Sequence, residues 1–283
     1  MYKCKVAYLR QATVHLEGER KIKVRLSMNL DKMIAVRNNK TIYRDADRCL
    51  KVFEPDYSKT AVFQEALNQT RMEQIGLPVP KVLGITSING KWTILSEYIK
   101  GKTMAQLLEK YPEKKKEFLQ EFVTLQSTVH EKICPDLGKM KDKINRKITK
   151  TSLSATLRYD LHVRLETIPN HTQVCHGDFN PSNILLTRDG TPYILDWAHV
   201  TQGNAAADAA CTYLLFWLNS DTDTAQEYLH LFCQESHTPL HSIQEWIPIV
   251  AAARSVDGNA VQRAFLRTWL DVADNENDAG AVR

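Results

Sequence analysis

The chain of 283 residues is 43% hydrophobic and 25% charged, ordinary values for a globular protein that argue against disordered, collagen-like and coiled-coil classes. Its length suits about two domains, and its formal net charge of +4 is too small to indicate a nucleic-acid or membrane-binding protein. The charge is uneven, because residues 1–150 carry 30 Lys and Arg against 17 Asp and Glu, whereas residues 151–283 carry 7 against 16. The two halves are therefore expected to meet differently charged surroundings.

The six cysteines are scattered, with no CxxC pair and no His at metal-ligand spacing, which argues against a zinc site and a disulfide framework. Reduced thiols are typical of the cytosol, so we expect a cytoplasmic protein. Residues 1–14 lack the apolar run of a signal peptide. The longest apolar runs, near residues 213–218 and 247–253, are shorter than the about 20 residues of a membrane-spanning helix. We expect neither secretion nor membrane insertion.

Short strands dominate the first hundred residues. Apolar residues alternate on both sides of Gly18 between residues 12 and 26, which predicts a β-hairpin. Further short runs, rich in β-branched and large apolar residues and separated by polar turns, predict strands at 33–36, 41–43 and 49–53. We expect an antiparallel sheet.

One helix and a second hairpin complete this β-rich part. Ser58 is a suitable N-cap for a helix that ends at Gly76. Two apolar runs joined by Asn89 and Gly90 predict a hairpin, because this dipeptide favours the tight turns that connect paired strands. We therefore predict a first domain over residues 1–100.

Beyond residue 100 the apolar spacing changes from 2 to 3.6 residues, which predicts a mainly helical second domain over residues 101–283. A loop and a hairpin interrupt the helices between residues 174 and 200, and helices resume from Ala205 to about Asp274. The basic stretch 139–150 lacks interleaved aromatic residues and is interpreted as a solvated helix face. The predicted fold class is α+β, a small antiparallel β lobe with one helix followed by a larger helical lobe.

The strongest motif is HGDFNPSN at residues 176–183, followed by an apolar run, a turn and Asp196. Pairing of the strand after Asn183 with the strand before Asp196 would bring these two side chains to neighbouring ends of a hairpin. Their oxygen atoms suit Mg²⁺, whose coordination is usually completed by water and substrate phosphates. Asp178 is then left to act as a base. The alternative is that Asp178 and Asn183 only cap turns.

This arrangement resembles the catalytic loop and metal-binding Asp of the protein-kinase-like superfamily. HGD with a later DW is similar to the aminoglycoside phosphotransferase and choline kinase branch, not to the HRD and DFG of eukaryotic protein kinases. The resemblance runs from Met33 to Leu218 and implies a two-lobed protein-kinase-like fold. It also implies that Asp178 is the catalytic base and that Asn183 and Asp196 hold Mg²⁺.

The same resemblance requires a Lys on a strand of the first lobe and a Glu on the following helix. Lys51 lies within the apolar run CLKVF, and Glu65 follows fourteen residues later. In isolation, Lys51 is consistent with an edge strand and Glu65 with a solvated helix face. Their joint spacing favours an ion pair that holds nucleotide phosphates. The segment 96–101 resembles the hinge between lobes, which implies that backbone groups near Glu97 and Ile99 bind the adenine.

Three positions depart from the family pattern or are ambiguous within it. The stretch 35–43, at the place of the phosphate-covering loop, contains no glycine. Nucleotide binding there would rely on charges such as Arg37 and Lys40, and the alternative is an ordinary hairpin turn.

Asn180 stands where the family commonly has His. Asp208 matches an Asp that supports the catalytic loop and is interpreted as structural, with a simple helix-dipole role as the alternative.

These residues predict a small-molecule kinase that transfers the γ-phosphoryl group of ATP, or alternatively GTP, to a hydroxyl group in a cleft between the lobes, with Mg²⁺ as cofactor. The acceptor is not identified by the fold. The resemblance allows sugar-like acceptors among others. Residues 201–250 contain six acidic residues and no Lys or Arg, which favours a cationic acceptor unless this acidity lies on an unrelated surface.

Three other classes are weighed against this prediction. An atypical protein kinase would share the fold, but the sequence has no recognisable APE-type activation segment. A nucleotide-binding pseudoenzyme would explain the glycine-free stretch, although all five catalytic-type residues are present. A nucleic-acid-binding protein needs clustered basic residues with stacking aromatics, which the sequence lacks. We expect a small-molecule partner and no nucleic-acid or membrane partner, and the sequence does not indicate an oligomeric state.

Overall fold

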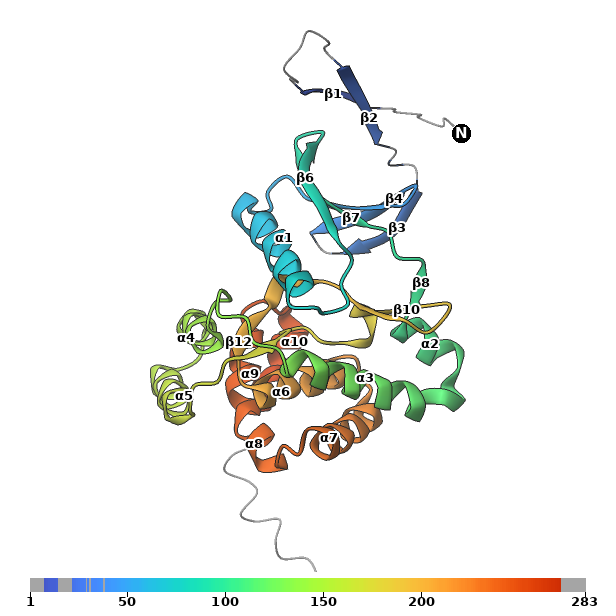
Figure 1. Cartoon of the computed structure of the whole chain (residues 1–283). Helices are drawn as coiled ribbons and strands as arrows, with labels where there is room; N and C mark the ends of the chain where they lie inside the picture. The colour runs from blue at the N-terminus through green and yellow to red at the C-terminus, as the bar shows by residue number, and fades with distance from the viewer. Residues whose placement is uncertain (1–7, 15–21, 29, 31, 38, 271–283) are drawn as a thin grey trace, which may run out of the picture. The chain divides into compact units, whose positions relative to one another are not determined.

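The structure of the chain is a computed structural model that describes residues 8–14, 22–28, 30, 32–37 and 39–270 (Figure 1). The chain divides into two compact units. Unit 1 comprises residues 1–70 and 80–100, and unit 2 comprises residues 71–79 and 101–283. The predicted assignment of nucleotide binding to residues 1–100 and of catalysis to residues 101–283 stays a prediction.

A five-stranded antiparallel sheet forms the centre of unit 1, in the order β3-β4-β5-β7-β6. The predicted strands and the second hairpin are confirmed, and Asn89 and Gly90 both take the positive φ values, 53° and 78°, that a tight hairpin turn requires. The strands are β3 (Lys32–Arg37), β4 (Lys40–Asp45), β5 (Arg48–Phe53), β6 (Val82–Ile88) and β7 (Lys91–Glu97).

Helix α1 (Lys59–Gln74) packs on this sheet, as the predicted single helix of this lobe requires. It begins as predicted, because the side chain of Ser58 accepts a hydrogen bond from the backbone N–H of Ala61, 3.4 Å away. It ends before Gly76, whose φ of 80° suits a glycine that terminates a helix. Buried apolar side chains join helix and sheet, and burial of such groups stabilises the contact; they are Phe53, Val62, Ala66 and Ile94.

The predicted N-terminal hairpin is also present as a separate two-stranded sheet. Strand β1 (Tyr8–Val14) pairs antiparallel with β2 (Ile22–Met28), and Val14 lies opposite Ile22. Gly18, the predicted turn residue, lies outside the described residues.

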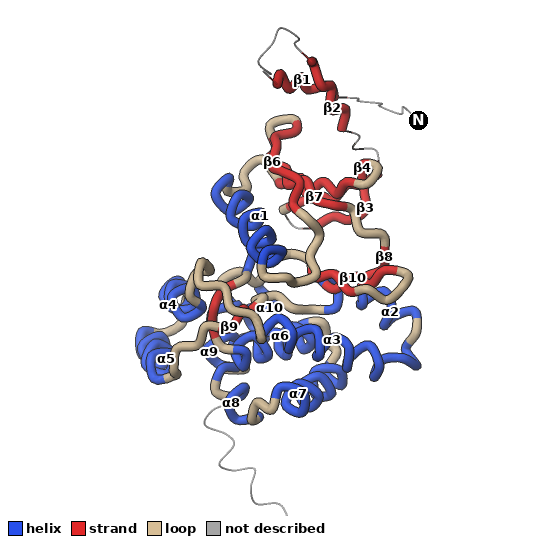
Figure 2. Tube along the Cα trace, viewed as in Figure 1, coloured by secondary structure: helices blue, strands red, loops and turns tan. Residues whose placement is uncertain are grey.

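Unit 2 is mainly helical, as Figure 2 shows by its blue segments. Helix α6 is apolar around almost its whole circumference and is nearly completely buried, so it forms part of the core. The predicted helical end near Asp274 lies outside the described residues. The helices are α2 (Met104–Lys110), α3 (Lys115–His130), α4 (Met140–Lys150), α5 (Ala155–Thr167), α6 (Ala205–Leu218), α7 (Thr222–Ser236), α8 (Leu240–Gln244), α9 (Trp246–Ser255) and α10 (Ala260–Arg267).

Two small sheets carry the loops of the HGDFNPSN motif. One has the strand order β11-β10-β8 and the other pairs β12 with β9. Their strands are β8 (Gly101–Thr103), β9 (Gln173–Cys175), β10 (Ile184–Thr187), β11 (Pro192–Ile194) and β12 (Thr201–Gly203). The antiparallel β part and the helical part confirm the predicted α+β fold class. Among the described residues, no helix has the length and apolar character needed to span a membrane.

Gly101 allows β8 to approach β10 closely. A Cβ atom at this position would lie 2.3 Å from the carbonyl oxygen of Leu186, a backbone atom that has little freedom to move. We expect Gly101→Ala to lower the free energy of unfolding by about 1–3 kcal/mol, the usual range for overpacking, in urea titrations. Gly138→Ala is the control, because a Cβ there meets no atom within 4 Å. Equal stability of the two variants would contradict this account of the β8–β10 contact.

Candidate active site

The loop that carries Asp178 connects β9 to the 3₁₀ helix η2 (Pro181–Asn183). Asn180 caps η2, since its Oδ1 accepts a hydrogen bond from the backbone N–H of Ser182 at 3.0 Å, and Pro181 suits the first helical position. The neighbouring Phe179 is completely buried and packs against Phe122, with ring centroids 4.7 Å apart. A buried aromatic ring and a capped turn therefore fix the backbone on both sides of the loop.

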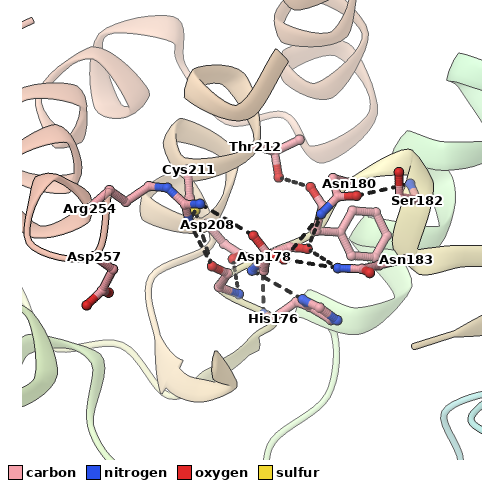
Figure 3. Close-up of polar contacts among 12 residues, drawn as sticks. His176, Asp178, Asn180, Ser182, Asn183, Asp208, Cys211, Thr212, Arg254 and Asp257 are labelled. Carbon is pink, nitrogen blue, oxygen red and sulfur yellow. Dashed lines mark hydrogen bonds and ion pairs between the residues drawn. The ribbon is translucent and has the colours of Figure 1, made fainter. Parts of the chain in front are cut away.

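The carboxylate of Asp178 is held from two sides (Figure 3). The side-chain amide nitrogens of Asn183 and Asn180 donate to its Oδ2 at 3.1 Å and 3.3 Å, and both also donate to its backbone oxygen. The guanidinium of Arg254 lies 3.4 Å from its Oδ1. The side chain of Asp178 still keeps 26% of its surface exposed, so a ligand can reach it.

The hairpin β10–β11 brings Asn183 next to Asp196, as its predicted pairing requires. Ile184 lies opposite Ile194, and the backbone N–H of Leu195 donates to the carbonyl of Asn183 at 2.8 Å. Asp196 adopts a left-handed backbone conformation, with φ of 66° and ψ of 64°. Non-glycine residues in this region are strained and concentrate at functional sites.

Asn183 and Asp196 offer hard oxygen donors. The amide nitrogen of Asn183 is directed at Asp178, so Oδ1 is the atom of this side chain that can bind a cation. The side chain of Asp196 does not cap the 3₁₀ helix η3 (Trp197–His199) that follows it. An amide oxygen with a carboxylate fits Mg²⁺ better than a softer metal.

Asp208 supports the backbone of this loop from helix α6. Its carboxylate is 1% exposed and accepts hydrogen bonds from the backbone N–H groups of His176 at 3.0 Å and Gly177 at 2.7 Å. The ring of His130 contacts the same carboxylate at 3.0 Å. Burial opposes ionisation of Asp208, but the bonds from His130 and Gly177 outweigh it and lower its pKa. The interpretation of Asp208 as a support of the catalytic loop fits these contacts better than the helix-dipole alternative.

His176 and Gly177 complete the loop. The Nδ1 of His176 accepts the backbone N–H of Asp178 at 3.2 Å, so its Nε2 carries the hydrogen and donates to the carbonyl of Leu195 at 2.9 Å. This buried ring therefore links the loop of Asp178 to the loop of Asp196. Gly177 has a φ of 77°, and a Cβ atom there would lie 2.7 Å from the carbonyl oxygen of His199. Only glycine fits this position without strain.

In unit 1, Lys51 and Glu65 form an ion pair. Strand β5 is internal to the sheet, with Lys51 between Ile42 of β4 and Ile94 of β7, so the edge-strand alternative is excluded. Glu65 is 1% exposed, which excludes a solvated helix face for this residue. Lys40 joins the pair, with its Nζ 3.6 Å from the same carboxylate oxygen.

The glycine-free stretch 35–43 is a tight hairpin. Arg37 of β3 lies opposite Lys40 of β4, so only residues 38 and 39 connect the strands, and Asn38 lies outside the described residues. Lys40 is 9% exposed and turns toward Glu65, which is consistent with the expectation that this stretch supplies charge to a ligand.

The predicted hinge residues lie at the end of the sheet. Glu97 is the last residue of β7, and its backbone N–H donates to the carbonyl of Lys81 at 2.9 Å. Ile99 follows outside regular structure and is half-buried. Binding of adenine by these backbone groups stays a prediction.

A profile of the phosphotransferase enzyme family matches residues 35–246, about three quarters of the chain. The chain belongs to this family. The match confirms the family suggested by the motifs and the predicted enzyme class, a phosphotransferase. A search of curated protein sequences gives no match.

Solved structures of phosphotransferases share the fold at low sequence identity. Aminoglycoside-3'-phosphotransferase of type VIII is 15% identical, with 78% of this chain and 93% of that chain covered and a TM-score of 0.61. A thermostable mutant of aminoglycoside phosphotransferase APH(4)-Ia, in a ternary complex with AMP-PNP and hygromycin B, is 17% identical, with 88% and 94% covered and a TM-score of 0.63. Choline kinase LicA from Streptococcus pneumoniae is 15% identical, with 86% and 95% covered and a TM-score of 0.58.

Arg254 contacts the candidate site and was missed by the sequence interpretation. It lies on α9, beyond the part of the chain that the family profile matches. The available signal was its isolation, because it is the one charged residue in the helix WIPIVAAARS. A single Arg in such an apolar helix needs a partner, and here the partners include the carboxylate of Asp178.

The six acidic residues that favoured a cationic acceptor do not gather around Asp178. In the described part of the chain, none of the six contacts its side chain. Asp208 is buried beneath the loop, and Asp221 caps α7. Glu227 lies near Lys115, and Glu235 accepts hydrogen bonds from α3. The last two, Asp223 and Glu245, are exposed. The acidity of residues 201–250 therefore serves other contacts or the surface.

Replacing Asp208 should destabilise the phosphotransferase. In Asp208→Ala the backbone N–H groups of His176 and Gly177 lose their acceptor in a buried place, and each such loss costs about 1–3 kcal/mol. We expect a decrease of about 3 kcal/mol in the free energy of unfolding, measured by urea titration. Asp223→Ala, at an exposed position of α7, is the matched control and should change stability by no more than about 0.5 kcal/mol.

The pH dependence gives a second readout. Because the pKa of Asp208 is lowered in the folded chain from its ordinary value of 3.8, its stabilisation is present above about pH 4 and decreases as the pH falls further. Asp208→Ala should therefore flatten the stability profile in this acidic range. An unchanged profile would argue against a buried, ionised Asp208.

Proposed function

We propose that the chain is a small-molecule kinase that transfers the γ-phosphoryl group of ATP to a hydroxyl group of a small acceptor, with Asp178 as the catalytic base. One observation carries this proposal: in a chain of the phosphotransferase family, the accessible carboxylate of Asp178 is oriented by two side-chain amides. Retention of the paired Lys51 and Glu65 supports an active enzyme over a pseudoenzyme.

The nucleotide is ATP, with GTP as the alternative. Complexes of structural neighbours with AMP-PNP and with ADP support an adenine nucleotide. Lys51, oriented by Glu65, holds the α- and β-phosphates. Backbone groups of Glu97 and Ile99 bind the adenine edge. Lys40 adds a side-chain charge at the hairpin that has no glycine, because its ammonium group already lies beside the carboxylate that orients Lys51.

Asn183 and Asp196 hold Mg²⁺ through the amide oxygen and the carboxylate. When bound, this ion neutralises charge on the nucleotide phosphates. The left-handed backbone at Asp196 and the bond from Leu195 to Asn183 fix these two ligands in neighbouring positions.

The transfer step needs little covalent chemistry from the protein. Asp178 accepts the proton of the acceptor hydroxyl as that oxygen forms a bond to the γ-phosphorus. The bond between the γ-phosphorus and its bridging oxygen breaks, and ADP leaves with the electron pair. Asn180 and Asn183 keep the carboxylate turned toward the acceptor, so that positioning provides most of the catalysis.

Asp178→Asn tests this function. We expect turnover to fall at least about 100-fold, the usual contribution of a general base, while the Kd for Mg-ATP stays within about twofold of the wild type. ADP formation is measured with a panel of small alcohols, sugars, amino-sugars, aminoglycosides and generic protein substrates, and nucleotide binding is measured by calorimetry. Asp189→Asn, an exposed carboxylate in the turn between β10 and β11, is the control and should retain activity.

Undiminished phosphorylation by Asp178→Asn would exclude Asp178 as the base. Phosphorylation of only the protein substrates would favour an atypical protein kinase. Binding of Mg-ATP by the wild type without turnover of any acceptor would favour the pseudoenzyme.

Lys40→Met tests the charge at the glycine-free hairpin. We expect the Kd for Mg-ATP to rise about tenfold, because a charge-assisted contact to phosphate contributes roughly 1.5 kcal/mol. The Kd for adenosine, which has no phosphate, should stay unchanged. Lys91→Met is the control, since Lys91 pairs with Glu54 at 2.7 Å and not with Glu65. Equal weakening of ATP and adenosine binding would show that Lys40 only supports the sheet.

A further inference from the structure

Arg254 contacts Asp178 and has two further cations near it, Lys143 and Lys147, and we name the three residues the basic cluster. Arg254 extends from α9, and its guanidinium donates to the carbonyl of Gly177 at 3.3 Å and to the sulfur of Cys211 at 3.0 Å, besides its contact with Asp178 (Figure 3). Its side chain remains 24% exposed. The arginine is therefore anchored on one side and accessible on the other.

The other two cations come from α4, which packs on α9. Lys143 and Lys147 are four residues apart and so lie on one face of this helix. The Nζ of Lys143 donates to the carbonyl of His199 at 2.8 Å, and the Nζ of Lys147 lies 2.5 Å from the carboxylate of Asp257. The interpretation of residues 139–150 as a solvated face therefore needs correction at these two lysines.

The members of the basic cluster are close enough to influence one another. Burial lowers the pKa of Lys143 to about 8, and the charges of Lys147 and Arg254 contribute, against the opposing effects of Cys211 and Asp257. Burial together with the positive charges of Lys143 and Lys147 also lowers the pKa of His199, so this ring adds no charge near neutral pH.

Four carboxylates lie near this charge, and their partners decide how they oppose it. Asp257 is 63% exposed and pairs with Lys147, and Asp208 is buried and accepts hydrogen bonds from the backbone N–H groups of His176 and Gly177. The charge of Asp196 raises the pKa of His199 from the neighbouring loop, and it is shared with Mg²⁺ under the proposed function. Among the described residues, Asp178 is the carboxylate that contacts Arg254, so a group that approaches Asp178 from this side meets a guanidinium, although residues 201–250 are acidic in composition.

We propose that the acceptor carries an anionic group, a carboxylate or a phosphate, and that Arg254 with Lys147 and Lys143 binds it while a hydroxyl group of the same molecule reaches Asp178. This inference rests on the proposed function, because it names the substrate class of the same site. A hydroxyl in hydrogen-bond range of Asp178 lies next to the guanidinium, where a cationic acceptor would be repelled.

The geometry of Arg254 supports this role. Its contact with Asp178 is a single long approach of 3.4 Å, and not the paired, parallel bonds that a guanidinium makes with a carboxylate. A guanidinium that is 24% exposed and not fully paired matches a carboxylate or phosphate of a ligand better than a single hydroxyl.

Matched acceptors test the charge preference. Glycerol, glycerate, glycerol 3-phosphate and 3-amino-1,2-propanediol form one series, and glucose, gluconate, glucose 6-phosphate and glucosamine form another. For the wild type with Mg-ATP, kcat/KM is measured for each compound, and binding is measured separately by calorimetry with Mg-AMP-PNP. We expect an anionic member to exceed its neutral and cationic counterparts at least tenfold, and the carboxylate and phosphate arms identify which anion is bound.

Variants connect this preference to the basic cluster. Lys147→Gln should raise KM for the preferred anionic acceptor at least tenfold and leave KM for its neutral counterpart within about twofold. Arg254→Gln also removes a contact to Asp178, so its expected effect is a rise of at least tenfold in the ratio of KM for the anionic acceptor to KM for the neutral one. Arg254→Gln can act by weakening anion binding or by moving the carboxylate of Asp178. Lys147→Gln tests anion binding alone, because Lys147 has no contact with Asp178 among the described side chains. Arg146→Gln, on the exposed side of the same helix, is the control and should match the wild type. Thermal melting of each variant checks that it is folded.

The outcomes separate this inference from the proposed function. Preference for cationic or neutral acceptors, failure of every anionic compound to bind, or an unchanged KM in both variants overturns the anionic acceptor. Phosphorylation of cationic alcohols would leave the kinase function in place. Binding of anions that depends on Arg254 and Lys147, without phosphoryl transfer to any compound, would support the anion site and overturn the kinase function.

Discussion

The buried carboxylate of Asp208 is the constraint on which the geometry of the loop depends. It accepts backbone hydrogen bonds from His176 and Gly177, and His130 contacts it from α3. Because Asp208 lies on the nearly fully buried helix α6, these bonds attach the loop to the core of unit 2. The ring of His176 then links this loop by a hydrogen bond to the carbonyl of Leu195, next to Asp196. The proposed base and the proposed metal ligands thus share one support.

The features that could be predicted from sequence are set by local chain geometry. A two-residue turn at Asn89 and Gly90 determines the register of its hairpin, and a short hairpin likewise brings Asn183 beside Asp196. The pair of Lys51 and Glu65 was predictable by a different route, from spacing along a family pattern. Each of these predictions needs only a strand, a turn or a helix in the expected place, and no knowledge of how distant segments pack.

The features that could not be predicted depend on contacts between distant segments. Arg254 reaches Asp178 across 76 positions of the chain, and the lysines of α4 meet α9 only through helix packing. Nothing in the local sequence distinguishes Lys143 and Lys147 from Lys150, which is exposed on the same helix. Asn180 is intermediate: its cap on η2 follows from the Asn-Pro sequence, but its bond to the carboxylate of Asp178 depends on the folded turn.

The uneven charge of the two halves also acquires a structural explanation. The carboxylates of the candidate site, Asp178, Asp196 and Asp208, all belong to the acidic half, whereas Lys40, Lys51 and the lysines of the basic cluster belong to the basic half. Composition alone suggested a cationic acceptor, because it assigned the sign of the acidic half to its binding site. Packing of α4 on α9 brings cations of both halves together near Asp178, since one helix comes from each half. The charge around a site is thus determined by which helices meet there, and not by the average charge of the segment that contains the proposed base.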